Sequence, residues 1–88
     1  MKYRVIVKKK AIKSIRKLPV NIQKRMVLSV DDLKDNGPVV RNWPNYNKLS
    51  ATEYHCRLTR KWVACWRVEK GSIEIAVYYA GSRENAPY

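Results

Sequence analysis

Three consecutive stretches in the second half of the chain alternate apolar and polar residues, and only short connections separate them. They span about residues 52 to 58, 62 to 69 and 72 to 80. Such alternation is typical of β-strands that bury one face, and connections of a few residues join antiparallel neighbours. The core face is predicted to carry Trp62, Ala64, Trp66 and Val68 from the second stretch and Ile73, Ile75, Val77 and Tyr79 from the third. The opposite face is predicted to carry His55, Arg57, Val63, Cys65, Arg67, Glu74, Ala76 and Tyr78.

The first half of the chain predicts a strand followed by two helices. Residues 2 to 8 alternate, whereas residues 9 to 18 and 20 to 36 repeat their apolar residues at helical spacing on either side of Pro19. A proline after Asn36 and Gly37 ends the second helix, and the Asn- and Pro-rich residues 37 to 51 are predicted to be irregular. The sequence therefore predicts one α+β domain over residues 1 to 88. Its plan is β-α-α-β-β-β, with a helical hairpin packed on a small, mainly antiparallel four-stranded sheet.

The charge of the chain restricts its partners. Among 88 residues there are 19 Lys and Arg against 7 Asp and Glu, a formal net charge of +12. Phosphate is the commonest partner of such a surface, an acidic protein segment is the second candidate, and a membrane surface is a weaker third. No segment approaches the roughly 20 apolar residues of a spanning helix, and the N-terminal residues lack the long apolar run of a signal peptide. The chain is therefore expected to be cytoplasmic.

Cysteine usage argues against a disulfide or a metal site. Cys56 and Cys65 lie in predicted strands, and in a reducing compartment such residues are usually small buried hydrophobes. Two cysteines and a single histidine, without a closely spaced ligand pair, fall short of a structural zinc set. The expectation is that the protein uses no metal and no other cofactor.

His55 and Arg57 point to the chemistry that the exposed strand face offers. Histidine moves protons near neutral pH, and arginine binds phosphate, so the pair suggests a surface that binds and cuts RNA. Metal-free RNA cleavage needs a base for the 2′-OH, cations for the charged phosphorane and an acid for the leaving oxygen. The structural alternative is a solvated histidine, with Arg57 paired to Glu74 or Glu53 across the sheet.

Further candidates lie outside this strand. Arg83 follows the last strand, where loops present functional groups, although it also suits a strand cap or a pair with Glu84. Aromatic Tyr88 and Tyr78 are available for stacking on bases. The candidate RNA-binding residues are Lys8, Lys9, Lys10, Arg60, Lys61 and Arg67. For the lysines of the predicted first helix, an acidic partner segment or plain solvation are open alternatives.

The chain resembles the RelE/HigB/ParE superfamily of bacterial toxins from toxin-antitoxin modules. The resemblance covers nearly the whole length and rests on the small basic β-α-α-β-β-β plan and on the order of several short segments. Those segments are Lys48-Leu49, Tyr54-His55-Cys56-Arg57-Leu58, the strand from Trp62 to Val68, and Gly81-Ser82-Arg83-Glu84 with a near-terminal Tyr88.

The resemblance implies a metal-independent endoribonuclease that cuts mRNA in the ribosomal A site. Its partners would then be ribosomal RNA and a cognate antitoxin, acidic or partly disordered. Arg83 matches a late arginine that serves transition-state stabilisation or acid catalysis, and Tyr88 matches a C-terminal aromatic that stacks on a base. His55 and Arg57 match two basic strand residues, one of them the general base.

Two positions depart from the family pattern. An arginine often follows the aromatic residue that opens the second hairpin strand, and here Val63 follows Trp62. Arg60, Lys61 or Arg67 are candidates to supply that charge. A catalytic histidine often follows the late glycine, and here Ser82 and Arg83 follow Gly81. ParE relatives poison DNA gyrase without cutting RNA, so a gyrase poison is the first alternative and a non-catalytic RNA- or antitoxin-binding module is the second.

Overall fold

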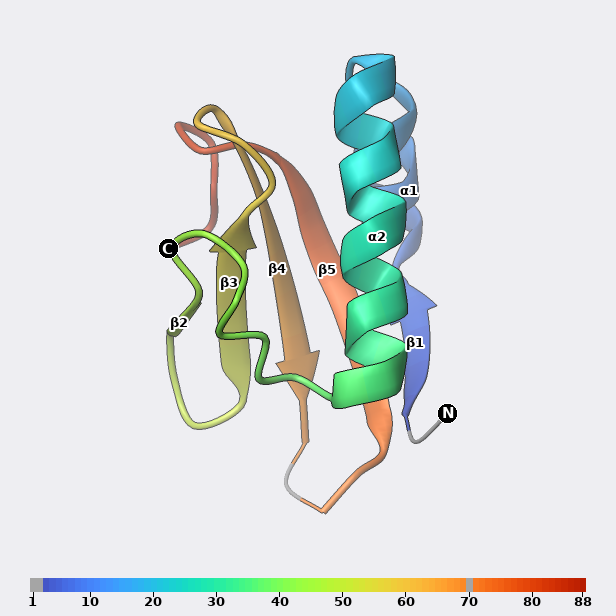
Figure 1. The fold of residues 1–88 in the computed structure, drawn as a ribbon, viewed down its shortest axis with the longest axis vertical. Coiled ribbons are helices and arrows are strands. Elements are labelled where there is room, and N and C mark those ends of the chain that lie inside the picture. Colours follow the sequence, from blue (N-terminus) through green and yellow to red (C-terminus); the bar gives the residue numbers. More distant parts are fainter. Residues whose placement is uncertain (1–2, 70) are drawn as a thin grey trace.

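The computed structural model describes residues 3–69 and 71–88 (Figure 1). In chain order the elements are β1 (Arg4–Val7), α1 (Lys9–Arg16), α2 (Val20–Asn36), β2 (Asn47–Lys48), β3 (Glu53–Arg57), β4 (Trp62–Val68) and β5 (Glu74–Ser82). The strands form one sheet in the order β1-β5-β4-β3-β2, in which β1 pairs with β5 in parallel and the other neighbours are antiparallel. Among the described residues, no helix is long and apolar enough to cross a membrane.

One face of the sheet is covered by two different parts of the chain. The helical hairpin lies over the side of the sheet that β1 and β5 form, and the segment of residues 37–46 crosses toward β3 (Figure 1). This segment is held on the core: Trp66 donates from its indole nitrogen to the carbonyl of Pro38 at 3.1 Å, and the Tyr46 ring stacks on Tyr54 and Trp66. The core between these layers contains Leu33, Leu58, Trp66, Ile75 and Val77, all of which are 0–1% exposed.

The turn after α2 requires a glycine. Gly37 has a φ of 85° and donates its backbone N–H to the carbonyl of Leu33 at 2.9 Å, which closes the helix. A Cβ at this position would lie 2.7 Å from the ring of Tyr3. The left-handed backbone and the approach of Tyr3 therefore both select glycine here.

Most predicted elements are confirmed, with small changes of length. The second helix spans 20–36 as predicted, the first ends at Arg16 instead of residue 18, and the last strand extends to Ser82. Lys2, within the predicted first strand, and Lys70, in the predicted final turn, lie outside the described residues.

The prediction of a four-stranded sheet is wrong by one short strand. Within the predicted irregular segment, Asn47 and Lys48 form β2, which pairs with His55 and Tyr54 at the edge of the sheet. A two-residue strand has no alternating pattern to detect, and these two residues form a strand only through their pairing with β3.

Tyr79 does not lie on the predicted face. The register between β4 and β5 shifts at Cys65 and Trp66: Cys65 pairs with Tyr79, whereas Trp66 pairs with Val77. The extra residue is Tyr78, and a bulge of this kind reverses the alternation beyond it. Tyr79 therefore joins the face of Cys65 and not the core face of Ile75 and Val77.

Candidate active site

The sheet face opposite the helices, hereafter the open face, carries most of the candidate residues. It contains His55, Arg57, Val63, Cys65, Arg67, Ala76, Tyr78 and Tyr79. The pair of Arg57 and Val63 lies at one end of the β3–β4 ladder and the pair of Glu53 and Arg67 at the other. These are called the Arg57 end and the Arg67 end below.

The C-terminal residue returns to the open face at His55. The rings of His55 and Tyr88 lie 4.4 Å apart between centroids, with an interplanar angle of 39°. Burial raises the pKa of the Tyr88 hydroxyl, the buried Cys65 thiol raises it further, and the charges of Arg83 and Arg57 lower it. The charges of both arginines therefore act on Tyr88, whose ring is tilted against that of the histidine.

The surroundings of His55 favour the neutral form of its imidazole. Burial lowers the pKa of His55 from its ordinary 6.5, and the positive charge of Arg57 lowers it further. Its Nδ1 atom is buried and has no hydrogen-bond partner within residues 3–69 and 71–88. A neutral imidazole at pH 7 is able to accept a proton, which is the requirement for a general base.

Arg57 is fixed by the segment that precedes β2. Its backbone N–H donates to the carbonyl of Pro44 at 2.8 Å. With the amide oxygen of Asn45 turned toward the guanidinium, Arg57 donates to it from Nε at 2.8 Å and from Nη2 at 2.9 Å. Neither acidic residue considered from the sequence is its partner: Glu53 pairs with Arg67 and Glu74 with Arg4.

Arg83 is tied to the hairpin between β3 and β4. Its backbone N–H donates to the carbonyl of Lys61 at 2.8 Å. A groove of about 390 Å³ lies between that hairpin and the C-terminal loop, and its lining residues are Arg60, Lys61, Trp62, Ser82, Arg83 and Glu84. Three cations therefore line one concave surface beside an aromatic ring, a combination suited to nucleic acid.

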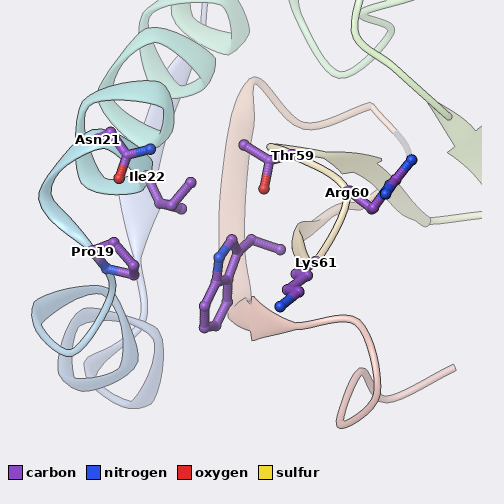
Figure 2. A pocket seen from close by; sticks show the side chains of 7 residues that line it. Pro19, Asn21, Ile22, Thr59, Arg60 and Lys61 are labelled. Carbon is purple, nitrogen blue, oxygen red and sulfur yellow. The ribbon is translucent and has the colours of Figure 1, made fainter.

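The same hairpin borders a second groove, on the side of the helices. This groove, of about 330 Å³, is lined by Pro19, Asn21, Ile22, Thr59, Arg60, Lys61 and Trp62. Figure 2 shows Pro19 and Ile22 across it from Thr59, while the Arg60 side chain points away. Arg60 also lines the groove that contains Arg83.

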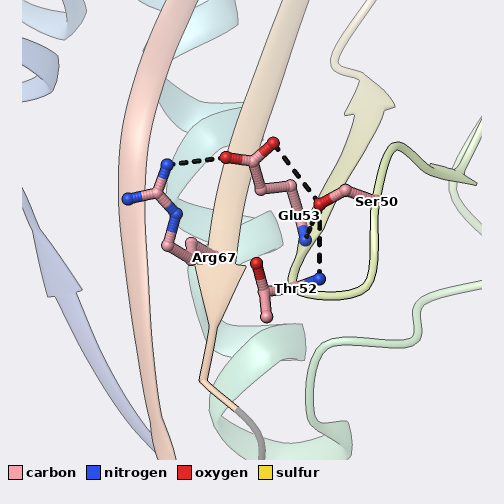
Figure 3. A network of polar contacts seen from close by, with 4 residues as sticks. All are labelled: Ser50, Thr52, Glu53 and Arg67. Carbon is pink, nitrogen blue, oxygen red and sulfur yellow. Dashed lines mark hydrogen bonds and ion pairs between the residues drawn. The ribbon is translucent and has the colours of Figure 1, made fainter.

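At the Arg67 end of the open face, the charge of the arginine is paired with a carboxylate. Arg67 donates to the Glu53 carboxylate at 2.6 Å, and Ser50 lies on the other side of that carboxylate (Figure 3). The hydrogen bond with Glu53 raises the pKa of Arg67, and its guanidinium lies 5.2 Å above the ring of Tyr78. Burial raises the pKa of Tyr78 to about 12 and that of Cys65 to about 12.

The structure thus divides the predicted site residues into groups. The rings of His55 and Tyr88 are in contact, the charges of Arg57 and Arg83 act on Tyr88, and Arg60 and Lys61 line one groove with Arg83. Lys8 and Arg67 line a different groove, with Glu69 and Glu74 also in its wall. Lys9 and Lys10 are exposed in the first turn of α1. Arg67 pairs with Glu53, so its charge is partly compensated, whereas no such ion pair is found for Arg60 or Lys61 among residues 3–69 and 71–88.

One neighbour of Arg57 is not apparent from the sequence. Asn45 was treated only as part of an irregular, Asn-rich stretch, and its contact with Arg57 depends on the path of the segment along β3. Both cysteines are free and buried. Over residues 3–69 and 71–88, no three His, Cys, Asp or Glu side chains gather in a way that would hold a metal ion.

Several solved structures have the same fold as this chain. An archaeal RelE from a RelE-RelB complex of Pyrococcus horikoshii is 23% identical, with 98% of this chain and 100% of that chain covered at a TM-score of 0.78. Isolated E. coli RelE toxin is 15% identical (97% and 88% covered, TM-score 0.73). A YoeB/ParE toxin of Agrobacterium tumefaciens is 9% identical (91% and 98% covered, TM-score 0.75). No family model and no curated protein sequence matches the chain. The chain therefore has the fold that RelE and YoeB toxins share.

Proposed function

We propose that this protein is the toxin of a toxin-antitoxin module and acts as a ribosome-dependent, metal-independent mRNA endoribonuclease. The observation that carries the proposal is the contact between the rings of His55 and Tyr88 on the open face, where the charge of Arg57 acts on both residues and that of Arg83 acts on Tyr88. These side chains come from β3, the loop after β5 and the C-terminus, so only the folded chain brings them together. The fold shared with RelE and YoeB toxins supports the same assignment.

Each residue has a role that its surroundings support. His55, whose lowered pKa favours the neutral form, takes the proton from the 2′-OH, and the 2′-oxygen attacks the adjacent phosphorus as the bond to the 5′-oxygen breaks. The 5′-oxygen takes a proton from water as it leaves, so the products are a 2′,3′-cyclic phosphate and a free 5′-hydroxyl. Arg57 and Arg83 stabilise the additional negative charge on the phosphorane. Arginine does not release its proton near neutral pH, so their role is electrostatic. Tyr88 stacks on a base with the ring face that His55 leaves free.

The partners follow from the distribution of charge. Lys8, Lys9, Lys10, Arg60 and Lys61 are exposed and would contact phosphates of ribosomal RNA, and action on ribosomes places the protein in the cytoplasm. A cognate antitoxin with an acidic segment would neutralise part of the net charge of +12. Solved complexes of RelE with RelB and of YoeB with YefM support a partner of this kind.

The test is cleavage of a defined mRNA on purified ribosomes, mapped by primer extension with EDTA present throughout. Wild type should cut, and His55→Ala and Arg83→Ala should each lose roughly 100-fold or more in rate. Lys24→Ala, at an exposed position of α2, is the matched control and should retain full rate. Wild-type protein that leaves ribosome-bound mRNA intact would refute the nuclease assignment.

One observation favours a second candidate, a gyrase poison. Val63, which pairs with both Arg57 and Gly81, is fully buried and stands where the family often has an arginine. The site therefore has one cation fewer than the family pattern. Inhibition of gyrase supercoiling by wild type, with no mRNA cleavage, would support this candidate. Growth arrest that persists in the His55→Ala, Arg83→Ala double variant, without either activity, would indicate a non-catalytic binding module.

A further inference from the structure

Asn45 occupies a backbone conformation that few residues accept. Its φ is 52°, in the left-handed region, where asparagine is tolerated better than most side chains. The backbone is fixed on both sides: Pro44 accepts the N–H of Arg57 at 2.8 Å, and the Tyr46 ring stacks on Tyr54 and Trp66 in the core. The Asn45 amide is therefore presented to the open face by a segment anchored in the core.

The contact uses only part of the guanidinium. Arginine has five N–H donors, and Asn45, with its amide oxygen turned toward the guanidinium, accepts from Nε and Nη2 of Arg57 at 2.8 and 2.9 Å. The remaining donors, on Nη1 and Nη2, still form a fork of the kind that binds a phosphate with two hydrogen bonds. The amide thus sets the plane of the guanidinium, and within residues 3–69 and 71–88 the edge formed by Nη1 and Nη2 has no further acceptor.

The neutrality of the amide matters as much as its position. Arg67, on the same face, is held by the carboxylate of Glu53 at 2.6 Å, which compensates its charge. A carboxylate at position 45 would compete with an incoming phosphate for Arg57 in the same way. An amide orients the guanidinium without this competition, because it carries no net charge.

We propose that Asn45 is a positioning residue, which orients the Arg57 guanidinium toward an RNA phosphate while leaving its positive charge uncompensated. The inference rests on the proposed function for its substrate. It adds a residue that acts through Arg57 and does not touch the reacting atoms.

Two substitutions separate orientation from charge. Asn45→Gly keeps the left-handed backbone and removes the amide, so the fold should hold while the guanidinium loses its orientation. Asn45→Asp keeps an acceptor and adds a negative charge beside Arg57. Asn42→Asp, at an exposed position of the same loop, adds the same charge without this contact and is the matched control.

The first measurement does not depend on catalysis. The Arg57 Nε–H resonance in ¹⁵N NMR should exchange slowly with solvent in wild type and rapidly in Asn45→Gly, with unchanged thermal unfolding. A single-stranded oligonucleotide with 2′-deoxyribose throughout should bind Asn45→Asp more weakly, and the salt dependence of its binding should have a slope smaller by about one. Asn42→Asp should bind nearly as wild type does.

The second measurement is cleavage on ribosomes. Asn45→Gly should lower kcat by about tenfold with little change in KM, because misorientation affects the transition state more than binding. Unchanged Nε–H exchange in Asn45→Gly, or equal binding by Asn45→Asp and Asn42→Asp, would overturn the inference. If wild type cuts no mRNA, the proposed function fails, while the exchange and binding measurements still decide the role of Asn45.

Discussion

Arg57 and Arg67 lie on the same face of the same two-strand ladder, yet their surroundings differ in charge. Arg67 is bound to the Glu53 carboxylate and lies over the Tyr78 ring, so its charge is compensated. Arg57 is bound to a neutral amide, beside a histidine whose pKa its charge helps to lower. An arginine on an exposed strand is therefore not in itself a phosphate site, and the charge of its nearest acceptor decides whether it is available.

The same contrast applies to the aromatic residues at the two ends. Tyr78 is a strand residue placed by the bulge, and its hydroxyl is close to the Cys65 thiol. Tyr88 belongs to the chain terminus, is 53% exposed, and reaches His55 from outside the sheet. One aromatic is part of the framework, whereas the other is available to a ligand.

The largest expected difference between the two ends is in cleavage rate. Arg57→Ala should slow mRNA cleavage on ribosomes by about 100-fold, because it removes a cation from the phosphorane. Arg67→Ala should leave the rate nearly unchanged. Equal losses in single-turnover assays would show that the whole face binds RNA and that the comparison is wrong.

A smaller effect is expected from the aromatic residue at the Arg57 end. Tyr88→Ala should lower kcat/KM by about tenfold, the effect of losing one stacked base. Tyr88→Phe keeps the ring and should retain most of the activity. A loss as large in Tyr88→Phe as in Tyr88→Ala would assign the role to the hydroxyl instead of the ring.

The titration of His55 tests whether the charge of Arg57, and not that of Arg67, acts on the histidine. The chain has a single histidine, so its NMR signal is unambiguous. Its pKa should lie below 6.5 because burial and the Arg57 charge disfavour the imidazolium. Arg57→Gln should raise this pKa, and Arg67→Gln should not change it.

The pH dependence of cleavage should follow the same titration. If His55 is the base, activity is present above its pKa and falls as the pH drops through it, so the acid limb lies below pH 6.5. In Arg57→Gln the residual activity should show an acid limb moved to higher pH. An acid limb that does not follow the His55 titration would remove the histidine from the role of base.

The smallest effect is expected on stability. The Glu53 and Arg67 side chains are 31% and 47% exposed, and such pairs contribute less than about 1 kcal/mol to the free energy of unfolding. A double-mutant cycle of Glu53→Ala and Arg67→Ala in urea should give a coupling energy in this range. Glu53→Gln alone should release Arg67 and strengthen RNA binding without raising the cleavage rate.

Much of the fold could be predicted from the sequence because local patterns control it. The 3.6-residue period and the Asn36-Gly37-Pro38 stop gave α2 its bounds, and strict alternation placed Trp62 to Val68 correctly. The face of Tyr79 was predicted wrongly, because a bulge adds one residue without changing the apolar pattern. The two-residue strand β2 was missed because pairing with β3, and not its own residues, creates it.

The candidate site, like the fold, could be predicted from the sequence only in part. His55 and Arg57 were found as neighbours because their spacing along a strand puts them on one face. The contact of Tyr88 with His55 and the partner of Arg57 depend on residues distant in the chain. The ion pair of Arg67 with Glu53 was not anticipated either, and it compensates part of the charge of one cation considered as a substitute at the Val63 position.

By itself, the sequence determined the helices, the main strands, the basic charge and the residue types on the open face, since these depend on periodicity and composition. Only the tertiary structure decided which acceptor Arg57 and Arg67 each contact. The net charge is a sum over the chain, but whether the charge of one arginine is compensated depends on whether its nearest acceptor is a carboxylate or an amide. Strand pairing and the path of residues 37–46 place Glu53 beside Arg67 and Asn45 beside Arg57.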